Sequence, residues 1–326
     1  MHKKGSKKDP KNYRPISLTS GFSRLFETII HEKVSSFLIS SSKLSHSQFG
    51  FLAKRSSESQ LLSCLNEWLW TYVNKESLDV IYMDIAKAFD SVSHVKLIKV
   101  ITSYGIDKNL TNWLNEFLKN RTQRVCIGKT VSQPVKVVSG VPQGGVIGPL
   151  LFVIFIDDLC KMKILKDKEV SIKLFADDSK IYSKCPTKLQ LALNDSLTWT
   201  NNRQLKVAPS KCFQLRISKT KSQLDPEYAI DGMKLQSETA VVDLGVTVTE
   251  HLRWDKHIDK IYNKVSATSY QIRNCFKTKN IWVLLKLYIT YVRPKLEFNT
   301  CVWSPYRKKD IVRLESVQKR FTRSIF

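Results

Sequence analysis

The sequence predicts an α+β fold, in which a mixed β-sheet is backed by helices and followed by a helical C-terminal region. Short runs rich in β-branched and aromatic residues indicate strands at 78–84, 170–175 and 212–217. Amphipathic segments with helical spacing lie between these runs, and from Trp254 onward the hydrophobic period is helical. Strands and helices in this order favour a sheet with helices packed behind it.

The composition indicates a globular protein with a polyanionic partner. The 326 residues are 42% hydrophobic and 25% charged, enough for two or three subdomains around a large core. The net charge of +24 points to nucleic acid. The seven cysteines form no C-x-x-C pair, which fits reduced thiols and disfavours a zinc site. No targeting signal is visible and the longest apolar run, 149–156, is too short to span a bilayer, so we expect no membrane partner and a nuclear or cytoplasmic location.

Two helices are predicted before the first strand, at 16–37 and 59–73. The inner face of the first is predicted from helical spacing to hold Leu25, Phe26, Ile29, Ile30, Val34 and Phe37. The strand 78–84 ends on Asp84, at the sheet edge where ligand-binding groups are commonly presented. Asp90 is interpreted as a helix N-cap before a helix at 94–104.

The stretch 139–159 combines an irregular loop with an apolar helix. Its glycines allow backbone to approach a ligand closely, and Gln143 offers both a donor and an acceptor. Pro149 is expected to open a helix that runs to Leu159. The pair Asp157–Asp158 is expected to be the solvated end of that helix, without a chemical role.

A second acidic pair lies in the stretch LFADDSKIY. A strand at 170–175, a tight turn at 176–179 and a return strand from Lys180 place Asp177 and Asp178 at the tip of an apolar hairpin. Adjacent carboxylates raise each other's pKa, and a divalent cation would neutralise them. The alternative is ordinary turn chemistry, in which Asp is common.

The remaining segments continue this mixed pattern before the helical region. We expect a helix at 189–200, a hairpin at Asp231–Gly232 and one strand at 241–249. Between Lys256 and Phe326 there are sixteen Lys or Arg residues and four Asp or Glu residues. Such a basic helical region suits contact with the phosphates of a duplex.

The chain resembles the reverse transcriptase of non-LTR (LINE-like) retrotransposons. Eight stretches carry the resemblance in family order and cover nearly the whole chain: DPKNYRPISLTS, QFGF, VIYMDIAKAFDSVSH, SGVPQGGVIGPLLFVIFIDDL, LFADDSKIY, LKVAPSKCFQLRIS, LGVTVTEHLRWDKHI and YVRPKLEF with VWSPYRKKDI. The resemblance implies a right-hand polymerase fold. Its expected parts are fingers at 1–77, a palm at 78–250 with a fingers insertion around 105–140, and a helical basic thumb at 251–326.

The resemblance also implies an RNA-directed DNA polymerase that transfers nucleotides with two Mg²⁺ ions, Mn²⁺ being an alternative ion. By similarity Asp84, Asp177 and Asp178 are the catalytic carboxylates, and they hold the metals together with the Ile85 backbone carbonyl. The family pattern gives nucleotide-binding or template-binding roles to Arg14, Arg24, Phe89, Gln143, Gly144 and Lys211.

The implied partners are an RNA template, a DNA primer or RNA–DNA duplex, and dNTPs, and the oligomeric state stays open. Gly145 stands where the family commonly has Ser, a change expected to preserve the loop. Such elements usually also carry an endonuclease and a nucleic-acid-binding tail, so this chain is expected to be a fragment or a degraded copy. The alternative function is therefore a non-catalytic nucleic-acid-binding remnant of the same polymerase.

Overall fold

The computed structural model describes residues 2, 5–9, 12–13, 15–119, 121–167, 169–219, 226–278 and 280–323. Its contacts divide the chain into two compact units. The first comprises residues 1–56, 80–214 and 226–236, and the second comprises residues 57–79, 215–225 and 237–326. The predicted bounds of fingers, palm and thumb stay a prediction.

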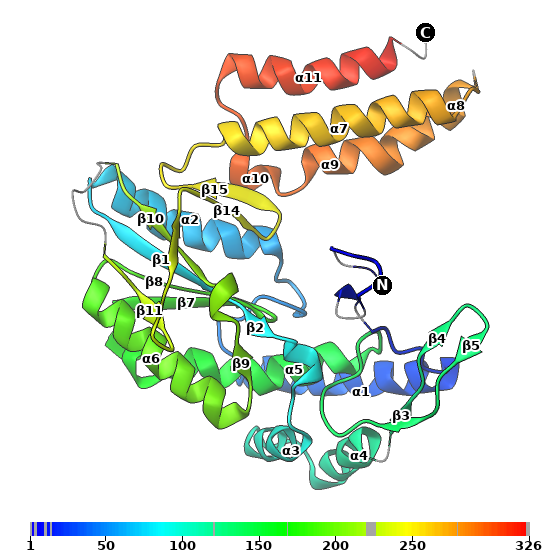
Figure 1. Cartoon of the computed structure of the whole chain (residues 1–326), viewed down its shortest axis with the longest axis vertical. Coiled ribbons are helices and arrows are strands. Elements are labelled where there is room, and N and C mark those ends of the chain that lie inside the picture. Colours follow the sequence, from blue (N-terminus) through cyan, green and yellow to red (C-terminus); the bar gives the residue numbers. More distant parts are fainter. Residues whose placement is uncertain are drawn as a thin grey trace. The chain divides into compact units, whose positions relative to one another are not determined.

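The first unit holds most of the strands of the chain and a layer of helices (Figure 1). Its helices are α1 (Gly21–Ser40), α3 (His94–Ser103), α4 (Lys108–Leu118), α5 (Ile147–Ile156) and α6 (Pro186–Arg203), with 3₁₀ turns at Ala88–Asp90, Asp157–Lys161, Lys163–Asp167 and Pro209–Lys211. Its strands are β2 (Ile85–Ala86), β3 (Thr122–Gln123), β4 (Cys126–Ile127), β5 (Thr130–Val131), β6 (Val135–Lys136), β7 (Val170–Phe175), β8 (Asp178–Ser183), β9 (Lys206–Val207), β11 (Ala229–Ile230) and β12 (Met233–Lys234).

Three strands begin in one unit and end in the other, namely β1 (Leu78–Met83), β10 (Phe213–Ile217) and β13 (Gln236–Glu238). They complete a five-stranded sheet with the order β13-β10-β1-β8-β7. The predicted strands at 78–84, 170–175 and 212–217 are therefore confirmed, to within a residue at their ends. The predicted hairpin at Asp231–Gly232 is also confirmed, because Ile230 pairs with Met233 across it.

The core of the first unit forms around α5, which is apolar on all sides. Nine of its ten residues are buried, as expected for a helix with no polar face. This helix packs against α1 and α3, while α6 packs against β7 and β8. Each buried Leu or Phe side chain contributes roughly 1.5–3 kcal/mol to folding, so α5 is a major source of the unit's stability.

The predicted inner face of α1 is wrong in part. The helix begins at Gly21 because the Ser20 side chain accepts a hydrogen bond from Ser23 N, so the residues from Ile16 precede it. Its buried residues are Glu27, Ile30, Val34 and Leu38, whereas Leu25, Phe26, Ile29 and Phe37 are exposed. The periodicity was misread because a carboxylate, Glu27, belongs to the buried face.

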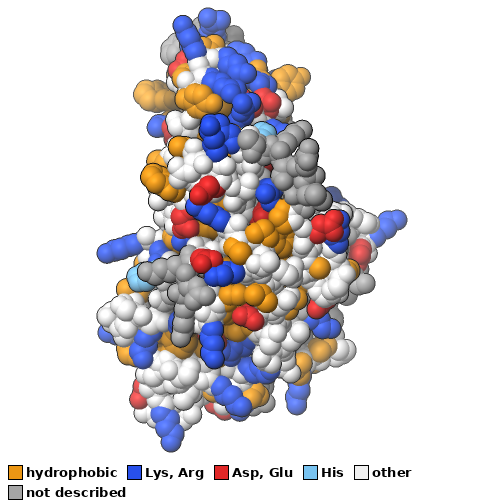
Figure 2. Space-filling view, turned by 90° about the vertical axis from the view of Figure 1, so that its left-hand side faces the viewer, with side chains coloured by type: hydrophobic (Ala, Val, Ile, Leu, Met, Phe, Trp, Pro, Cys, Tyr) orange, Lys and Arg blue, Asp and Glu red, His pale blue; other side chains and the backbone are white. Residues whose placement is uncertain are grey.

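The second unit is mainly helical. It contains α2 (Ser57–Val73), α7 (Asp255–Cys275), α8 (Ile281–Leu287), a π-helical turn (Tyr288–Val292), α9 (Arg293–Glu297), α10 (Thr300–Trp303) and α11 (Lys308–Thr322). The helix α7 packs against α9 and α11, and α10 packs against α2. Figure 2 shows Lys and Arg side chains gathered over these C-terminal helices, at the top of the view. Among the described residues, none of the helices is long and apolar enough to cross a bilayer.

The single strand predicted at 241–249 is instead a hairpin of β14 (Ala240–Asp243) and β15 (Val246–Thr249). Its two turn residues, Leu244 and Gly245, have φ angles of +45° and +88°. Positive φ at both positions is the pattern of a type I′ hairpin turn. The prediction failed because the apolar period continues unbroken through a leucine that occupies the turn.

Candidate active site

Asp84 lies directly after β1, at the point where the chain enters β2. Its backbone is fixed on both sides, because Ala208 N donates to the Asp84 carbonyl over 2.9 Å and Asp84 N donates to Cys212 Sγ over 3.4 Å. Burial raises the pKa of the Cys212 thiol, which keeps the sulfur neutral. The Asp84 side chain is 35% exposed and forms an ion pair of 2.9 Å with Lys211 Nζ.

Asp177 and Asp178 lie at the turn between β7 and β8. The turn is shorter than predicted, because Phe175 pairs with Asp178 and only Ala176 and Asp177 lie outside the ladder. Ala176 has a φ of +56°. A positive φ at the first of two central residues matches a type II′ hairpin turn. Asp178 is therefore the first, exposed residue of β8, while Asp177 is half-buried in the turn.

A side-chain hydrogen bond joins the neighbourhoods of these carboxylates. Ser179 Oγ donates to the Met83 carbonyl over 3.0 Å, and β1 and β8 are neighbours in the sheet. Asp84 follows Met83 and Asp178 precedes Ser179 in the sequence. The structure thus brings Asp84 and the Asp177–Asp178 turn to the same end of the neighbouring strands β1 and β8.

The described residues hold no group of three or more His, Cys, Asp or Glu side chains arranged to bind a metal ion. The acidic residues at this end of the strands therefore do not form a complete metal-binding site by themselves. Mg²⁺ commonly takes only one or two protein carboxylates and completes its shell with water and substrate phosphates. The carboxylate oxygens of these acidic residues are ligands of the kind that such a partly hydrated Mg²⁺ ion prefers.

The Ile85 carbonyl, predicted as a metal ligand, is directed by the β2–β9 ladder. Ile85 pairs with Val207, and the carbonyl of the preceding residue, Asp84, accepts a hydrogen bond from Ala208 N. Hydrogen-bonded and non-hydrogen-bonded pairs alternate in an antiparallel ladder, so the Ile85 carbonyl points away from β9. It is thereby left on the side of β2 opposite to the ladder.

The loop with Gln143 and Gly144 lies between two fixed segments. Ser17 N donates to the Gln143 carbonyl over 2.7 Å, and Gln143 Nε2 donates to Asp90 Oδ1 over 2.7 Å. Asp90 is therefore not a helix N-cap as predicted; Ser93 occupies that position before α3. Gly144 has a φ of +101°, and a Cβ there would lie 3.1 Å from the Ser17 carbonyl oxygen. Only glycine adopts this conformation without strain.

Phe89 is half-buried beside this loop, in the 3₁₀ turn that follows β2. Its ring stacks on Phe152 of α5, with centroids 4.4 Å apart and planes 16° apart. The exposed Phe51 ring meets Phe89 edge to face at 6.1 Å. One face of Phe89 is thus fixed by the core.

The two predicted arginines differ in what the structure describes. Arg24 is exposed in the first turn of α1, and its Nε donates to Thr19 Oγ1 over 3.3 Å. Arg14 lies outside the described residues. Their predicted contact with a triphosphate or template stays a prediction.

Glu27 is a buried carboxylate next to the Gln143–Gly144 loop that the sequence pattern missed. Its side chain is 1% exposed, and Oε2 accepts from Val146 N over 2.8 Å and from Ile147 N over 3.1 Å. It therefore binds the N-terminus of α5, where backbone N–H groups lack helical partners. A Cβ at Gly145 would lie 2.8 Å from Glu27 Oε2, so this glycine leaves room for the carboxylate. The signal available in the sequence was this single acidic residue within the apolar run LFETII.

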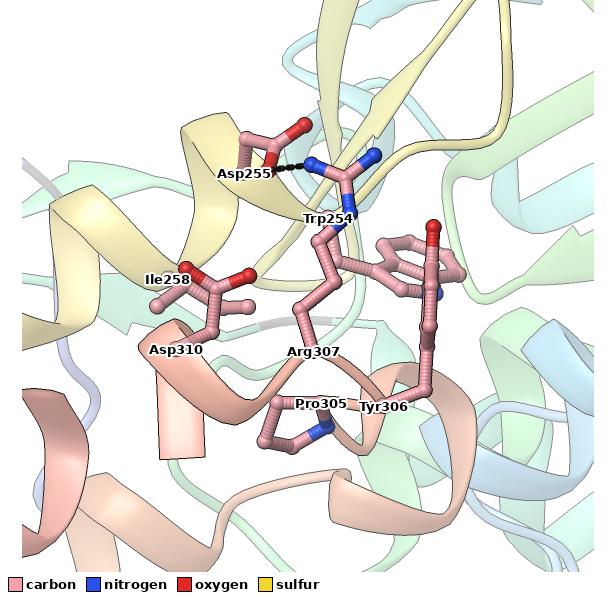
Figure 3. A pocket seen from close by; sticks show the side chains of 7 residues that line it. All are labelled: Trp254, Asp255, Ile258, Pro305, Tyr306, Arg307 and Asp310. Carbon is pink, nitrogen blue, oxygen red and sulfur yellow. Dashed lines mark hydrogen bonds and ion pairs between the residues drawn. The ribbon is translucent and has the colours of Figure 1, made fainter. Parts of the chain in front are cut away.

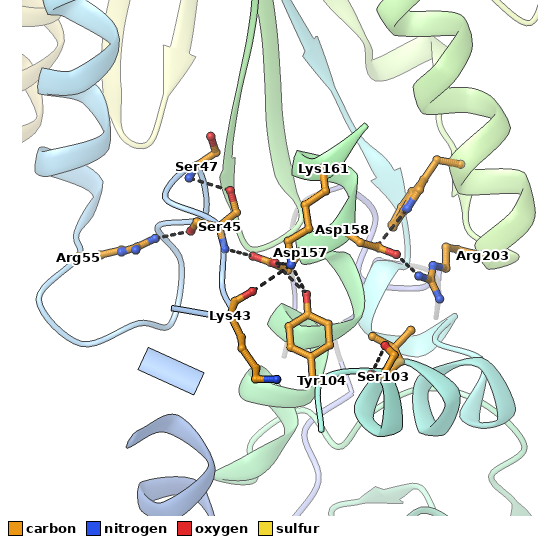
Figure 4. A network of polar contacts seen from close by, with 12 residues as sticks. Lys43, Ser45, Ser47, Arg55, Ser103, Tyr104, Asp157, Asp158, Lys161 and Arg203 are labelled. Carbon is orange, nitrogen blue, oxygen red and sulfur yellow. Dashed lines mark hydrogen bonds and ion pairs between the residues drawn. The ribbon is translucent and has the colours of Figure 1, made fainter. Parts of the chain in front are cut away.

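The pair Asp157–Asp158 is not a solvated helix end, and that prediction is wrong (Figure 4). Asp157 is fully buried and accepts hydrogen bonds from Ser45 N and Tyr104 Oη, each over 2.8 Å. Lys161 Nζ lies 2.7 Å from Asp157 Oδ2, the oxygen that also accepts from Tyr104. Asp158 is bound by Arg203 and by Trp199 Nε1, the latter over 3.1 Å. The chain neutralises these carboxylates with its own donors, so the pair is structural.

A small pocket in the second unit joins two of the stretches that carry the family resemblance (Figure 3). It is lined by Trp254, Asp255, Ile258, Pro305, Tyr306, Arg307 and Asp310. Arg307 Nη1 pairs with Asp255 Oδ1 over 2.7 Å, which ties the start of α11 to the start of α7. The ion pair gives these residues a structural role in the helical unit.

Comparison with known proteins gives the family of this chain. Residues 2–248 match the family described as reverse transcriptase (RNA-dependent DNA polymerase). A probable RNA-directed DNA polymerase from transposon BS of Drosophila melanogaster is 28% identical over the whole chain. A probable RNA-directed DNA polymerase from transposon X-element and an RNA-directed DNA polymerase from mobile element jockey, both of the same organism, are each 25% identical. The chain spans 37% of the length of each of these relatives.

Solved structures share the fold at low sequence identity. A telomerase from Candida albicans aligns with 93% of this chain and 57% of its own, with a TM-score of 0.54 and 9% identity. An apo telomerase from Candida tropicalis, truncated from its C-terminal domain, covers 72% of this chain and 45% of its own, with a TM-score of 0.51 and 13% identity. The predicted polymerase fold and the resemblance to retrotransposon enzymes are both confirmed. The chain belongs to the reverse transcriptase (RNA-dependent DNA polymerase) family.

Proposed function

We propose that this chain is an RNA-directed DNA polymerase that adds dNTPs to a primer 3′-hydroxyl by two-metal-ion nucleotidyl transfer. The observation that carries the proposal is the hydrogen bond from Ser179 Oγ to the Met83 carbonyl. It ties the start of β8 to the end of β1, so that Asp84, Asp177 and Asp178 share one edge of the sheet. Family membership adds the reaction class.

The proposed metal ligands are the carboxylates of Asp84, Asp177 and Asp178 and the Ile85 carbonyl. Asp178 is exposed and the Asp84 side chain is 35% exposed, so both can take up an ion from solvent. When bound, Mg²⁺ supplies Lewis-acid activation of the attacking hydroxyl and stabilises charge on the leaving pyrophosphate. The hydrogen bonds of the Asp84 backbone fix the position from which its carboxylate would bind that ion.

Lys211 is proposed to bind the triphosphate and to donate a proton to the pyrophosphate. Its side chain is 64% exposed and pairs with Asp84 across 2.9 Å. An exposed ion pair is weak, so the lysine can leave the carboxylate for a phosphate at little cost in free energy. The same pair then holds Lys211 beside the reacting groups before the nucleotide arrives.

The nucleotide itself is proposed to bind against Phe89 and the Gln143–Gly144 loop. The Phe89 ring is fixed against Phe152, so it can act as a rigid wall that excludes a 2′-hydroxyl and selects dNTPs. The hydrogen bond from Gln143 to Asp90 holds the loop next to that wall. Arg24 and Arg14 would add cationic contacts to the triphosphate or template.

The proposed nucleic-acid partners are an RNA template and a primer strand. The related telomerase from Candida albicans was solved in complex with a fragment of telomeric RNA. In this chain the net charge is +24, and its C-terminal helices carry a surface of Lys and Arg side chains (Figure 2). Such a surface supplies sequence-independent, salt-sensitive affinity for phosphate.

Primer extension on an RNA template tests the proposal. We expect extension by the purified chain in Mg²⁺, none in chelator, and loss of at least about a thousandfold in rate for Asp177→Ala with template binding retained. Asp195→Ala is the matched control, because Asp195 is exposed on α6. Template binding without extension by the unmodified chain would instead support the non-catalytic remnant. The absence of a three-ligand cluster among the described residues is the observation that keeps this second function in view.

A further inference from the structure

A short segment around Gln48 extends the sheet next to the proposed catalytic turn. Phe49 N donates to the Leu174 carbonyl over 2.8 Å, and Leu174 N donates to the Ser47 carbonyl over 2.9 Å. Gln48 and Leu174 therefore form a parallel bridge at the outer edge of β7, the last strand of the sheet. This segment contains the QFGF stretch, to which the proposed function assigns no role.

The Gln48 side chain continues from that bridge into the turn. It is fully buried, and its Oε1 accepts from Ala176 N over 3.3 Å and from Gly50 N over 2.9 Å. Ala176 immediately precedes Asp177 and carries the positive φ of the turn. An alanine resists this left-handed conformation because its Cβ crowds the following carbonyl. The hydrogen bond from Ala176 to Gln48 helps to hold it there.

Gly50 packs directly against the same turn. A Cβ at position 50 would lie 2.9 Å from the Phe175 carbonyl carbon and closer still to Ala176 N. These are backbone atoms, which cannot move aside as the end of a flexible side chain can. The glycine is thus required for the close approach that brings Gln48 within reach of Ala176.

The other end of the segment is anchored in the buried polar network of Figure 4. Ser45 N donates to the fully buried Asp157 carboxylate over 2.8 Å. Arg55 donates to the carbonyl of Ser45 over 2.7 Å and also to the carbonyl of Gln48. The segment is therefore fixed to the core before it meets the turn.

We infer that Gln48 is a positioning residue, which sets the direction of the Asp177 carboxylate by holding the Ala176 amide. The inference rests on the proposed function, since it assigns the consequence to metal-dependent nucleotidyl transfer. Gln48 does not contact a reacting atom; it acts through the backbone of the turn. Gly50 and Arg55 hold Gln48 in the place from which it does so.

The test compares Gln48→Met with Gln60→Met in primer extension. Methionine keeps the length of the side chain and removes the acceptor. Gln60 of α2 is equally buried, and its side-chain oxygen and nitrogen have no hydrogen-bond partner among the described contacts, so it is a matched control. For Gln48→Met we expect kcat to fall about ten- to a hundredfold and the Mg²⁺ concentration for half-maximal rate to rise, while primer–template affinity is unchanged.

A second substitution separates positioning from packing. Glycine tolerates positive φ without strain, so adding Ala176→Gly to Gln48→Met should raise kcat at least about threefold over that of Gln48→Met alone. A residue that only fills space would not be rescued in this way. Gly50→Ala, which forces the segment away from the turn, should reproduce the change in Mg²⁺ dependence.

The outcomes distinguish this inference from the proposed function. If Asp177→Ala abolishes extension but Gln48→Met leaves kcat and Mg²⁺ dependence at the level of Gln60→Met, the inference is overturned and the polymerase proposal stands. If the unmodified chain does not extend a primer, amide hydrogen exchange of a peptide covering residues 174–179 decides the matter instead. Faster exchange in Gln48→Met than in Gln60→Met supports the positioning role, and equal exchange overturns it.

Discussion

Two pairs of adjacent aspartates in the first unit have similar sequence contexts and different surroundings. Asp157–Asp158 follows the apolar helix α5, and Asp177–Asp178 follows the apolar strand β7. Asp157 is fully buried with a backbone amide, a tyrosine hydroxyl and a lysine around it. Asp178 is exposed, and Asp177 is half-buried in a two-residue turn.

The difference shows how a fold separates structural from chemical carboxylates. A buried charge is tolerated only when hydrogen bonds and an opposite charge compensate its lost hydration. Asp157 meets that condition through elements far apart in the sequence, at Ser45, Tyr104 and Lys161. At the strand turn, Asp178 is exposed, so an ion from solvent can reach it. The burial of Asp157 and the exposure of Asp178 therefore distinguish the two pairs.

The largest expected effect on stability is that of Asp157→Ala. It removes a buried carboxylate, leaves Ser45 N and the Tyr104 hydroxyl without their acceptor, and breaks the ion pair with Lys161. We expect the free energy of unfolding to fall by about 3–5 kcal/mol, because breaking a buried charge network costs that much. Urea denaturation followed by far-UV circular dichroism measures the change.

Asp178→Ala is the control for that experiment, since it removes an exposed carboxylate from the other pair. Its free energy of unfolding should fall by clearly less than that of Asp157→Ala, because an exposed carboxylate keeps much of its hydration. A loss of comparable size in both variants would contradict the division into a structural and a chemical pair.

The sequence carried enough information to predict the acidic turn and four of the five strands of the main sheet, but not β13. Alternation in 170–175 and the β-rich run 78–84 mark strands whose ends need no knowledge of tertiary contacts. Asp84 was therefore correctly predicted to follow a strand, and Asp177 was correctly predicted to lie in a hairpin turn, although Asp178 already belongs to β8. Their approach to one another depends on strand order, which the family resemblance supplied and the periodicity alone did not.

The sequence did not reveal the buried polar residues. Glu27, Gln48 and Asp157 each bind backbone amides of a segment distant in the chain, at Val146, Ala176 and Ser45. Hydrophobic periodicity assigns such residues to the solvent face, because it contains no information on long-range donors. For the same reason the buried face of α1 was predicted wrongly in part, and the Asp157–Asp158 pair was wrongly predicted to be a solvated helix end.

The pH dependence of stability gives a second test of the Asp157 network. Burial raises the pKa of Tyr104, and the nearby Asp157 carboxylate raises it further. In the unfolded chain this tyrosine ionises near pH 10, so above that pH the folded state holds a proton that the unfolded state has lost. Stability is then complete below pH 10 and falls as pH rises further, by at most about 1.4 kcal/mol per pH unit.

Tyr104→Phe should remove this part of the alkaline loss. We expect the urea midpoint of the unmodified chain to fall more steeply than that of the variant between pH 9.5 and about 11, although the variant starts lower at pH 8 because one hydrogen bond to Asp157 is gone. Parallel slopes for the two proteins would contradict a buried, neutral Tyr104 beside the carboxylate.

Asp158 should tolerate more change than Asp157, because it is closer to solvent. Its side chain is 31% exposed, and its partner Arg203 also lies over the rings of Phe155 and Trp199. Arg203→Met keeps much of the apolar contact and removes the charge, while Trp199 Nε1 still donates to Asp158. We expect a loss of about 1–2 kcal/mol in unfolding free energy, below that of Asp157→Ala. A larger loss than for Asp157→Ala would mean that Asp158 contributes more than Asp157 to the free energy of unfolding. Burial would then not decide which carboxylate is more important for stability.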